Sequence, residues 1–416
     1  MVLSTIIIWG AYFIGLYFTL FWLLVFLDKG AKDSQQKPLR KHPVVSVIVP
    51  AYNEEDSIAK TLDSVLHLRY PRHLLQIIAV NHGSTDTTGS IMDAYAAQGV
   101  TILHIKRSAK DRKGVAVNAG LALAKGSFVA CLDADSYIET DALHTMLPHF
   151  ADPAVAAVIP RMFALGTNTL IKKIQWVEYI VTFLYKRLMA HVDCLHVTPG
   201  PFTVYRKSCL DTVGNFDPYN LVEDMDMALR LQRHQMKIVQ IYNAVVTTET
   251  PTTWMEFYRQ RNRWYKGGFY NTMKNKDMMF NTKYGEFGCF QMPMMLGTAF
   301  LSLAVFTIIY YQQIFQPLYH KLLDWYYTGF PLKLSFETFV RNLHYLDINY
   351  SRLFFVYFVV IIGLIFIITA FKIGKIKLFS KGFRVPVYYF ALYPLVIFII
   401  WCGVAKDLLF KRKQTW

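Results

Sequence analysis

Two carboxylates stand close together after an apolar stretch of the sequence. Asp133 and Asp135 follow the run 128–132, whose residues are those of a buried strand. Hard divalent cations take carboxylate oxygens as ligands and share them with phosphate oxygens. The pair therefore predicts a Mg²⁺ or Mn²⁺ site that binds a phosphate-containing ligand. A turn explains an isolated pair of this spacing about as well, so the assignment depends on the motifs around it.

A second group of acids stands at the start of a helix-like segment. Glu223, Asp224 and Asp226 precede the run 227–233. Acids favour the N-terminus of a helix, so helix capping is one explanation of the group. The other is that Asp224 acts as a general base, which takes a proton from an acceptor hydroxyl. The residues by themselves leave both explanations open.

The segment 260–264 combines residues that suit an anion and a sugar. Gln260 and Trp264 are four positions apart and would share one face of a helix. Arg263 can neutralise a diphosphate leaving group, and the ring of Trp264 offers a flat surface on which a sugar stacks. The alternative is an Arg- and Trp-rich face on a helix at a membrane surface.

The elements that must position these residues are predicted to form an α/β domain. Residues 42–250 alternate strand-like and helix-like segments, which is typical of a mostly parallel sheet covered by helices. Ligands of such sheets bind beyond the carboxyl ends of the strands, where the polar motifs starting at Tyr52, Asn81 and Asp133 stand. The predicted strands are 44–49, 76–80, 101–105 and 127–132, and the predicted helices are 58–66, 88–97 and 114–124.

The composition of the whole chain is too apolar for an ordinary soluble protein. Hydrophobic residues make up 54% of the 416 residues, and aromatic residues make up 16%. A run of about twenty apolar residues can cross the hydrocarbon core of a membrane. Four runs approach that length: 6–27, 292–311, 353–371 and 385–404. The first has no basic residue before it and no small-residue cleavage site after it, which favours a retained anchor over a signal peptide.

Charge gives the expected location. The net charge of +15 is spread over the chain without a nucleic-acid-binding module, so no nucleic-acid partner is expected. Basic residues in 29–41 and 372–377 flank apolar runs. Because basic residues beside membrane segments favour the cytoplasmic side, we expect a multi-pass protein of the cell membrane whose middle region lies in the cytoplasm. Segments 170–190 and 254–274 mix aromatic and basic residues, as amphipathic helices in the membrane interface do. A domain helix with a solvated face is the alternative for each.

The sequence resembles the processive family 2 glycosyltransferases, which include the synthases of cellulose, chitin, hyaluronan and bacterial poly-N-acetylglucosamine. The resemblance covers residues 42–270, with the motifs in the family's order and spacing. The single apolar segment at the start and the later ones most resemble the compact poly-N-acetylglucosamine synthases. The matching positions are 50–55, 83–86, Lys113, Asn118, Asp133, Asp135, Glu223, Asp224, Gln260, Arg263 and Trp264.

The resemblance implies a role for each of these motifs. Glu223 and Asp224 would be catalytic, with Asp224 as the base. Gln260, Arg263 and Trp264 would hold the leaving diphosphate and the acceptor end of the chain, and the loop 198–202 would border the acceptor. The residues implied at the nucleotide are Tyr52, Glu54, Asn81, His82, Lys113 and Asp133, and those implied at the Mg²⁺ or Mn²⁺ ion are Asp133 and Asp135.

Two positions depart from the family pattern. The family usually has at least one Asp after the second strand, where it helps to bind uracil, whereas this chain has Asn81 and His82. Either residue can supply a neutral hydrogen-bond acceptor, which leaves the preferred nucleobase open. The other departure is Arg112, which stands where a Gly often precedes the Lys.

The resulting expectation is a GT-A-like α/β domain between membrane helices. The predicted parts are a transmembrane helix in 1–28, a glycosyltransferase domain in 42–250, an interfacial helix in 251–285 and a transmembrane bundle in 286–416. The expected function is inverting, processive transfer of a hexose or N-acetylhexosamine from a UDP-sugar to a growing polysaccharide that crosses the membrane.

Two other functions stay open. One is transfer of a single sugar to a membrane lipid, since ceramide glucosyltransferases share the motif that ends in Arg-Trp. The other is a non-catalytic membrane protein with a decayed transferase domain, although the expected catalytic acids are present. Besides the donor and the polysaccharide, the expected partners are membrane lipids and an accessory subunit or a second copy of the chain.

Overall fold

The computed structural model describes residues 2–29, 41–311, 315–328, 350–379 and 384–410. The chain divides into two compact units, one made of Met1–Leu24 and Gly297–Thr369, the other of Val25–Leu296 and Ala370–Trp416. The second unit carries all the motifs that we singled out. The predicted C-terminal membrane segment 286–416 is shared between the two units, and most of the basic stretch 29–41 lies outside the described residues.

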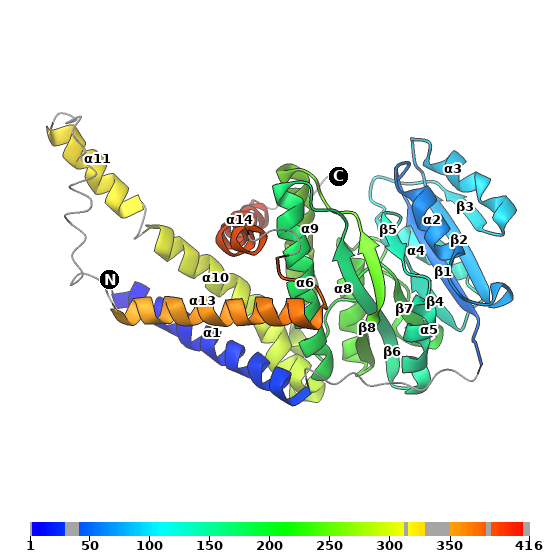
Figure 1. Ribbon diagram of the computed structural model, residues 1–416, viewed down its shortest axis with the longest axis horizontal. Coiled ribbons are helices and arrows are strands. Elements are labelled where there is room, and N and C mark those ends of the chain that lie inside the picture. The colour runs from blue at the N-terminus through cyan, green and yellow to red at the C-terminus, as the bar shows by residue number, and fades with distance from the viewer. Residues whose placement is uncertain (1, 30–40, 312–314, 329–349, 380–383, 411–416) are drawn as a thin grey trace. The chain divides into compact units, whose positions relative to one another are not determined.

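The described residues of the second unit contain an eight-stranded sheet with the order β3-β2-β1-β4-β7-β6-β8-β5 (Figure 1). Strands β1 to β4 pair in parallel with their neighbours, as predicted. Beyond β4 the sheet is mixed, because β7 runs antiparallel to both β4 and β6, and β5 runs antiparallel to β8. The strands are β1 (Val45–Ala51), β2 (Leu75–His82), β3 (Thr101–Ile105), β4 (Phe128–Cys131), β5 (Ser136–Ile138), β6 (Val155–Ala164), β7 (Thr203–Arg206) and β8 (Lys237–Thr248).

The reversed strand β7 matters for the site. Thr203, its first residue, pairs with Cys131, the last residue of β4. The loop before β7 therefore meets the loop after β4 at one edge of the sheet. Sequence alternation predicted the parallel strands, but it contained no sign of this long-range antiparallel pairing.

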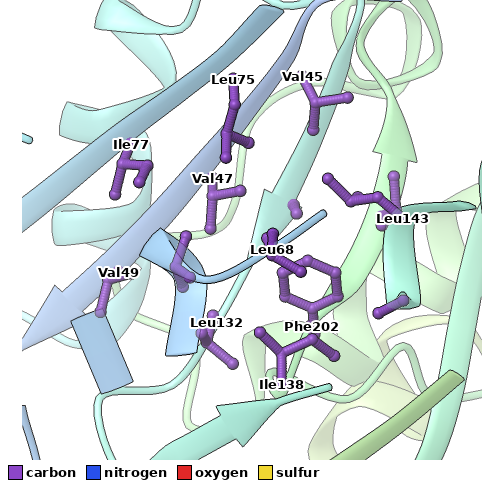
Figure 2. Close-up of a cluster of buried hydrophobic side chains, with 14 of the residues drawn as sticks. Val45, Val47, Val49, Leu68, Leu75, Ile77, Leu132, Ile138, Leu143 and Phe202 are labelled. Carbon is purple, nitrogen blue, oxygen red and sulfur yellow. The ribbon is translucent and has the colours of Figure 1, made fainter. Parts of the chain in front are cut away.

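Helices cover this sheet and close its core. Every residue of β1 is buried, as expected for a central strand packed on both faces. Side chains of β1 and β2 pack with Leu132, Leu143 and Phe202 in one hydrophobic cluster (Figure 2). The helices nearest the motifs are α2 (Ile58–Leu66), α3 (Thr88–Ala94), α4 (Lys113–Leu123), α5 (Ala142–Met146), α7 (Lys207–Val213) and α8 (Glu223–Arg233). The first three confirm the predicted helices to within a few residues.

Three longer helices pack together beside the sheet. Helix α6 (Leu170–His191) contacts β6 and β8, and α14 (Arg384–Leu409) contacts both α6 and α9 (Trp254–Lys274). Helix α9 begins with a capping box, in which the Thr253 hydroxyl accepts from the Glu256 N–H and the Glu256 carboxylate accepts from the Thr253 N–H.

Helix α6 is covered by protein on several sides: Arg187 is buried and the Lys residues of the helix are half-buried. The position of α6 in the membrane interface stays a prediction. Helix α9 is mixed, with Arg259 and Lys274 exposed and Arg261 and Lys266 buried.

Two of the described helices are long and apolar enough to cross a membrane. They are Trp9–Asp28, within α1 (Val2–Lys29), and Arg384–Leu409, which is α14. The predicted runs 292–311 and 353–371 lie in α10 (Met292–Tyr310) and α13 (Tyr350–Ile373), and neither has a described stretch that meets the same criteria of length and hydropathy. Four apolar runs in the sequence thus correspond to two candidate spans among the described residues.

Candidate active site

Two loops at the carboxyl end of the sheet are tied together by side chains. The loop after β1 places Asn53 against the loop after β2, where its side-chain oxygen accepts from the Thr85 N–H at 2.8 Å. The Glu55 carboxylate accepts from the Thr87 N–H and hydroxyl at 3.1 and 2.7 Å. These side chains connect the two loops, and none of them is among the residues that line the nearby cleft.

An ion-pair cluster lies at the centre of this cleft. Lys113, the first residue of α4, pairs with Asp133 after β4, and its Nζ lies 3.5 Å from Glu223 Oε1 at the start of α8. The two carboxylates raise the pKa of Lys113 against the effect of its burial, so the ammonium group stays charged. Three elements far apart in sequence thus meet at one cation.

Gly200 closes this cluster from the loop before β7. A Cβ at this position would lie 2.6 Å and 2.7 Å from the two carboxylate oxygens of Asp133, and it would also collide with Lys113 Nζ. Any side chain would therefore displace the pair. The register between β4 and β7 explains this close approach, since it brings the two loops together.

Asp135 is the second acid of the pair after β4. Burial, followed by the charges of Asp133 and Glu54, raises its pKa to about 7. Burial and Asp133 also raise the pKa of Glu54. The repulsion that Asp133 exerts on Asp135 and Glu54 favours a bound cation. Among the described residues, no group of three or more His, Cys, Asp or Glu side chains forms a complete metal site, so a cation here needs further ligands, such as phosphate oxygens.

Asp224 lies in the first turn of α8, behind Glu223. Its backbone carbonyl accepts from the Thr198 hydroxyl at 2.8 Å, and its side-chain Oδ1 accepts from the Met225 N–H at 2.8 Å. Burial, followed by the charge of Glu223, raises its pKa to about 6. The side chain thus bonds a backbone N–H in the first turn of α8, and a carboxylate with a pKa near neutrality is basic enough to serve as a general base.

Three arginines also line the cleft. Arg107, Arg112 and Arg263 come from the loop before α4 and from α9. Burial and then the charges of Arg107 and Arg263 lower the pKa of Arg112, which indicates that the three guanidinium groups are near one another. Arg107 also stacks over the ring of Tyr52 at 3.6 Å. Mutually repelling cations in a cleft make a site for a polyanion such as a diphosphate.

The two candidates for the nucleobase differ in role. The Asn81 side chain is used within the fold: its Oδ1 accepts from the Ser84 N–H at 3.0 Å, and its amide nitrogen lies 3.0 Å from His104 Nδ1. His82 lines the cleft and is buried, with its Nε2 3.6 Å from Asp111 Oδ2. Burial and Arg107 lower the pKa of His82, so the ring is neutral near pH 7.

Helix α9 contributes only part of its motif to the cleft wall. Arg263 lines the cleft, whereas the described lining includes neither Gln260 nor Trp264. The guanidinium of Arg261 instead lies 4.1 Å from the centre of the Trp264 ring. One face of that ring is therefore covered by the Arg261 guanidinium.

The structure gathers most of the predicted site residues. Those that line the cleft are Tyr52, Glu54, His82, Lys113, Asp133, Asp135, Glu223 and Arg263, and those that do not are Asn81, Asp224, Gln260 and Trp264. Sequence reasoning missed Arg107 and Asn220 in the lining and noted Arg112 only as a departure. The basic run that contains Arg107 and Arg112, placed between β3 and α4, was a signal that could have identified both.

Comparisons with known proteins identify a family domain and relatives of this chain. Residues 46–214 match the family described as glycosyl transferase family 2. The poly-beta-1,6-N-acetyl-D-glucosamine synthase of Staphylococcus epidermidis is 30% identical over 243 residues, which cover 56% of this chain and 58% of that protein. The beta-monoglucosyldiacylglycerol synthase of Nostoc sp. is 27% identical over 262 residues, 62% of this chain and 56% of that protein. The chain thus spans little more than half the length of these relatives.

A solved structure shares the fold. The mannosyltransferase PcManGT from Pyrobaculum calidifontis, in complex with GDP-Man and Mn²⁺, matches with a TM-score of 0.61 over 99% of this chain and 98% of that one, at 17% identity. At this identity the likeness establishes a GT-A-like fold with a mixed sheet and no particular substrate. The family match and the relatives confirm the resemblance to family 2 glycosyltransferases that the motifs indicated. Residues 46–214 thus form a glycosyl transferase family 2 domain.

Proposed function

We propose that the protein is an inverting glycosyltransferase that extends a β-linked polysaccharide, one hexose or N-acetylhexosamine at a time, from a UDP-sugar. The observation that carries this proposal is the convergence of Lys113, Asp133 and Glu223 in a cleft that Arg112 and Arg263 also line. The same cleft thus contains acids suited to a cation and guanidinium groups suited to a diphosphate. The poly-N-acetylglucosamine synthase among the relatives supports a polysaccharide product.

In the proposed step, an acceptor hydroxyl attacks the anomeric carbon on the face opposite the nucleotide. Asp224 accepts the proton of that hydroxyl as the new bond forms, and its raised pKa suits this task. The bond between the anomeric carbon and the diphosphate oxygen breaks, and UDP leaves with the bonding electrons. Arg112 and Arg263 stabilise the negative charge that develops on the leaving group.

Asp133 and Asp135, with Glu54 nearby, are the residues that would hold Mg²⁺ or Mn²⁺. The raised pKa values of Asp135 and Glu54 fit this assignment, because a cation would offset the repulsion among the acids. When bound, such an ion supplies Lewis-acid stabilisation of the diphosphate. Lys113 keeps Asp133 in place on the side of the cleft that faces α8.

A single transfer to a membrane lipid is the second candidate function. It is favoured by the beta-monoglucosyldiacylglycerol synthase among the relatives, whose similarity to this chain is close to that of the polysaccharide synthase. The apolar helix α14 lies directly against α9, which carries the proposed acceptor motif, and an acyl chain could therefore approach the site. Membrane attachment through α1 and α14, with the catalytic domain on the cytoplasmic side, serves both candidates.

One assay separates these functions. The purified full chain is incubated in detergent with UDP-glucose or UDP-N-acetylglucosamine, Mg²⁺, and either an oligosaccharide of the same sugar or diacylglycerol. We expect a ladder of lengthening products from the oligosaccharide, loss of turnover in excess EDTA, and recovery with Mg²⁺ or Mn²⁺. A single glycolipid product would support the second candidate. Absence of transfer from both donors to both acceptors would refute the proposal, and full activity in EDTA would refute the metal assignment.

The nucleobase is tested separately, by titrating UDP, GDP and TDP against the native protein and His82→Asp. We expect UDP to be preferred and to bind several-fold more tightly to His82→Asp, because a charge-assisted bond to uracil is stronger than a neutral one by on the order of 1 kcal/mol. Arg107 beside His82 favours a carboxylate at this position. His67→Asp, at an exposed position after α2, is the control. A preference of the native protein for GDP or TDP would overturn the UDP assignment.

A further inference from the structure

A buried ion pair lies directly behind the motif of α9. Arg261 is 1% exposed, and its Nη2 and Nε donate to the two carboxylate oxygens of Glu178 on α6 at 2.7 and 3.1 Å. The hydroxyl of Tyr393 on α14 donates to Glu178 Oε1 at 2.9 Å. Helices α6, α9 and α14 therefore meet at one carboxylate. None of these three residues was assigned a role from the sequence.

Stability alone is a weak reason for such a pair. Burying two charges costs free energy that their attraction barely offsets, and well-packed apolar residues often replace a buried pair without loss. A hydrophobic cluster is already present at the same junction, with Phe257, Ile400 and Val404 buried together. The ring of Tyr265 also stacks on Trp401, with centroids 5.0 Å apart and planes 6° apart.

The ion pair instead orients Gln260 and Trp264, the two motif residues that contact Arg261. With one edge of the guanidinium held by Glu178, its Nη1 donates to Gln260 Oε1 at 2.6 Å. The flat face of the same group lies 4.1 Å from the centre of the Trp264 ring. Arg261 thus contacts both Gln260 and Trp264 and fixes their orientation. Because its guanidinium covers one face of the Trp264 ring, a sugar could stack only on the opposite face.

We propose that Glu178 and Tyr393 are positioning residues that orient Gln260 and Trp264 through Arg261, so that the acceptor side of the site is complete only when α14 is docked on α6 and α9. This inference rests on the proposed function for its effect on catalysis. It couples an apolar helix, long enough to span a membrane, to the residues proposed to contact the acceptor. Donor binding, which depends on the cleft between β4 and α8, does not require α14.

The test uses the full chain with Tyr393→Phe, which removes one hydroxyl and keeps the ring, and Glu178→Gln, which removes the charge. Loss of a hydrogen bond to a charged group predicts that the KM for the acceptor rises about tenfold in Tyr393→Phe. UDP affinity should change less than about twofold, and more UDP should be released per sugar transferred, because water competes with a poorly held acceptor. The matched control is Cys402→Ala, at an exposed position of α14, which leaves Glu178 and its partners untouched. It should retain the acceptor KM of the native protein.

Hydrogen exchange provides a readout that does not depend on activity. Amide exchange in residues 254–274 should accelerate in Tyr393→Phe, while exchange in β1 and β4 stays unchanged. An unchanged acceptor KM and unchanged α9 exchange in Tyr393→Phe would overturn the inference, as would equal losses of UDP and acceptor affinity. If the native protein transfers no sugar, the proposed function fails, and the exchange experiment alone decides whether Tyr393 orders α9.

Discussion

At the scale of single residues, the site is defined by carboxylates in unequal surroundings. Asp133 is paired with Lys113, whereas burial raises the pKa of Asp135 to about 7 and that of Asp224 to about 6. Burial disfavours a charge unless a partner compensates it. The pair with Lys113 therefore holds Asp133 in place beside the proposed cation, while Asp135 is suited to bind that cation and Asp224 to accept a proton.

Replacing Asp224 with Asn should remove the base and keep the shape of the side chain. The rate of transfer should fall by roughly 10²–10⁴-fold, the usual effect of a positioned proton acceptor, with UDP affinity little changed. In the native protein the rate should rise as pH increases through about 6, because only the ionised form of Asp224 accepts a proton. Initial rates between pH 4.5 and 8.5 measure this acidic limb, which the Asn variant should lose. The exposed Asp211→Asn on α7 is the control. A near-native rate in Asp224→Asn would leave helix capping as the only role of the side chain.

Gly200→Ala should weaken binding of the donor. The added Cβ would lie 2.6 Å from Asp133 Oδ1, so the pair with Lys113 must shift. Overpacking costs about 1–3 kcal/mol, which corresponds to a loss of affinity on the order of tenfold. Calorimetric titration with UDP and Mg²⁺ measures the effect. Gly297→Ala, where a Cβ meets nothing within 4 Å, is the control. Native affinity in Gly200→Ala would show that the loop before β7 yields easily.

At the scale of elements, α14 is attached to the glycosyltransferase domain by close packing as well as by the Tyr393 contact. At Gly403 the chain of α14 passes so near the Tyr258 ring of α9 that a Cβ would lie 2.9 Å from the ring carbon bonded to the hydroxyl. The stack of Tyr265 on Trp401 and the pair of Lys266 with Asp407 extend this contact along the two helices.

Gly403→Leu should therefore release α14 from α9. The side chain cannot fit beside Tyr258, and a misfit of this kind costs about 1–3 kcal/mol. We expect a lower midpoint of thermal unfolding and faster proteolytic cleavage within α14, both measured in detergent. Cys402→Leu, one position away on an exposed face of α14, should change neither measurement. An unaltered midpoint in Gly403→Leu would mean that α14 is not docked as described.

At the scale of the whole molecule, the described apolar helices expose large hydrophobic side chains, whose contact with water is unfavourable. Phe13 and Leu24 of α1 are 64% and 65% exposed, and Ile399 of α14 is 52% exposed. Large exposed apolar side chains along a helix of this length are typical of contact with lipid. The glycosyltransferase domain carries its own buried core and needs no lipid to cover it.

The full chain should accordingly behave as an integral membrane protein. After cell lysis we expect it in the membrane pellet, resistant to sodium carbonate at pH 11 and released by detergent. A protein bound only through its basic surface would be released by carbonate or by high salt. Recovery in the soluble fraction after either wash would contradict the membrane assignment and, with it, the proposed passage of product across the membrane.

The sequence alone was sufficient for the family and for the first half of the sheet. Local alternation predicts parallel strands with helices between them, and the polar residues that follow each strand identify Asp133 and Asp135 as candidate ligands. These features are readable because each depends on residues close together in the chain.

Only the tertiary structure decided how distant residues are combined. The antiparallel placement of β7 brings Gly200 close to Asp133. The Asn81 side chain bonds to the Ser84 N–H and does not line the cleft. Helices α6 and α14 reach Arg261 through Glu178, which accepts from the Tyr393 hydroxyl. Each of these contacts joins segments with no local signal in common. The burial that sets the pKa of Asp224 is likewise a property of the assembled fold, because it depends on what surrounds the carboxylate and not on its neighbours in sequence.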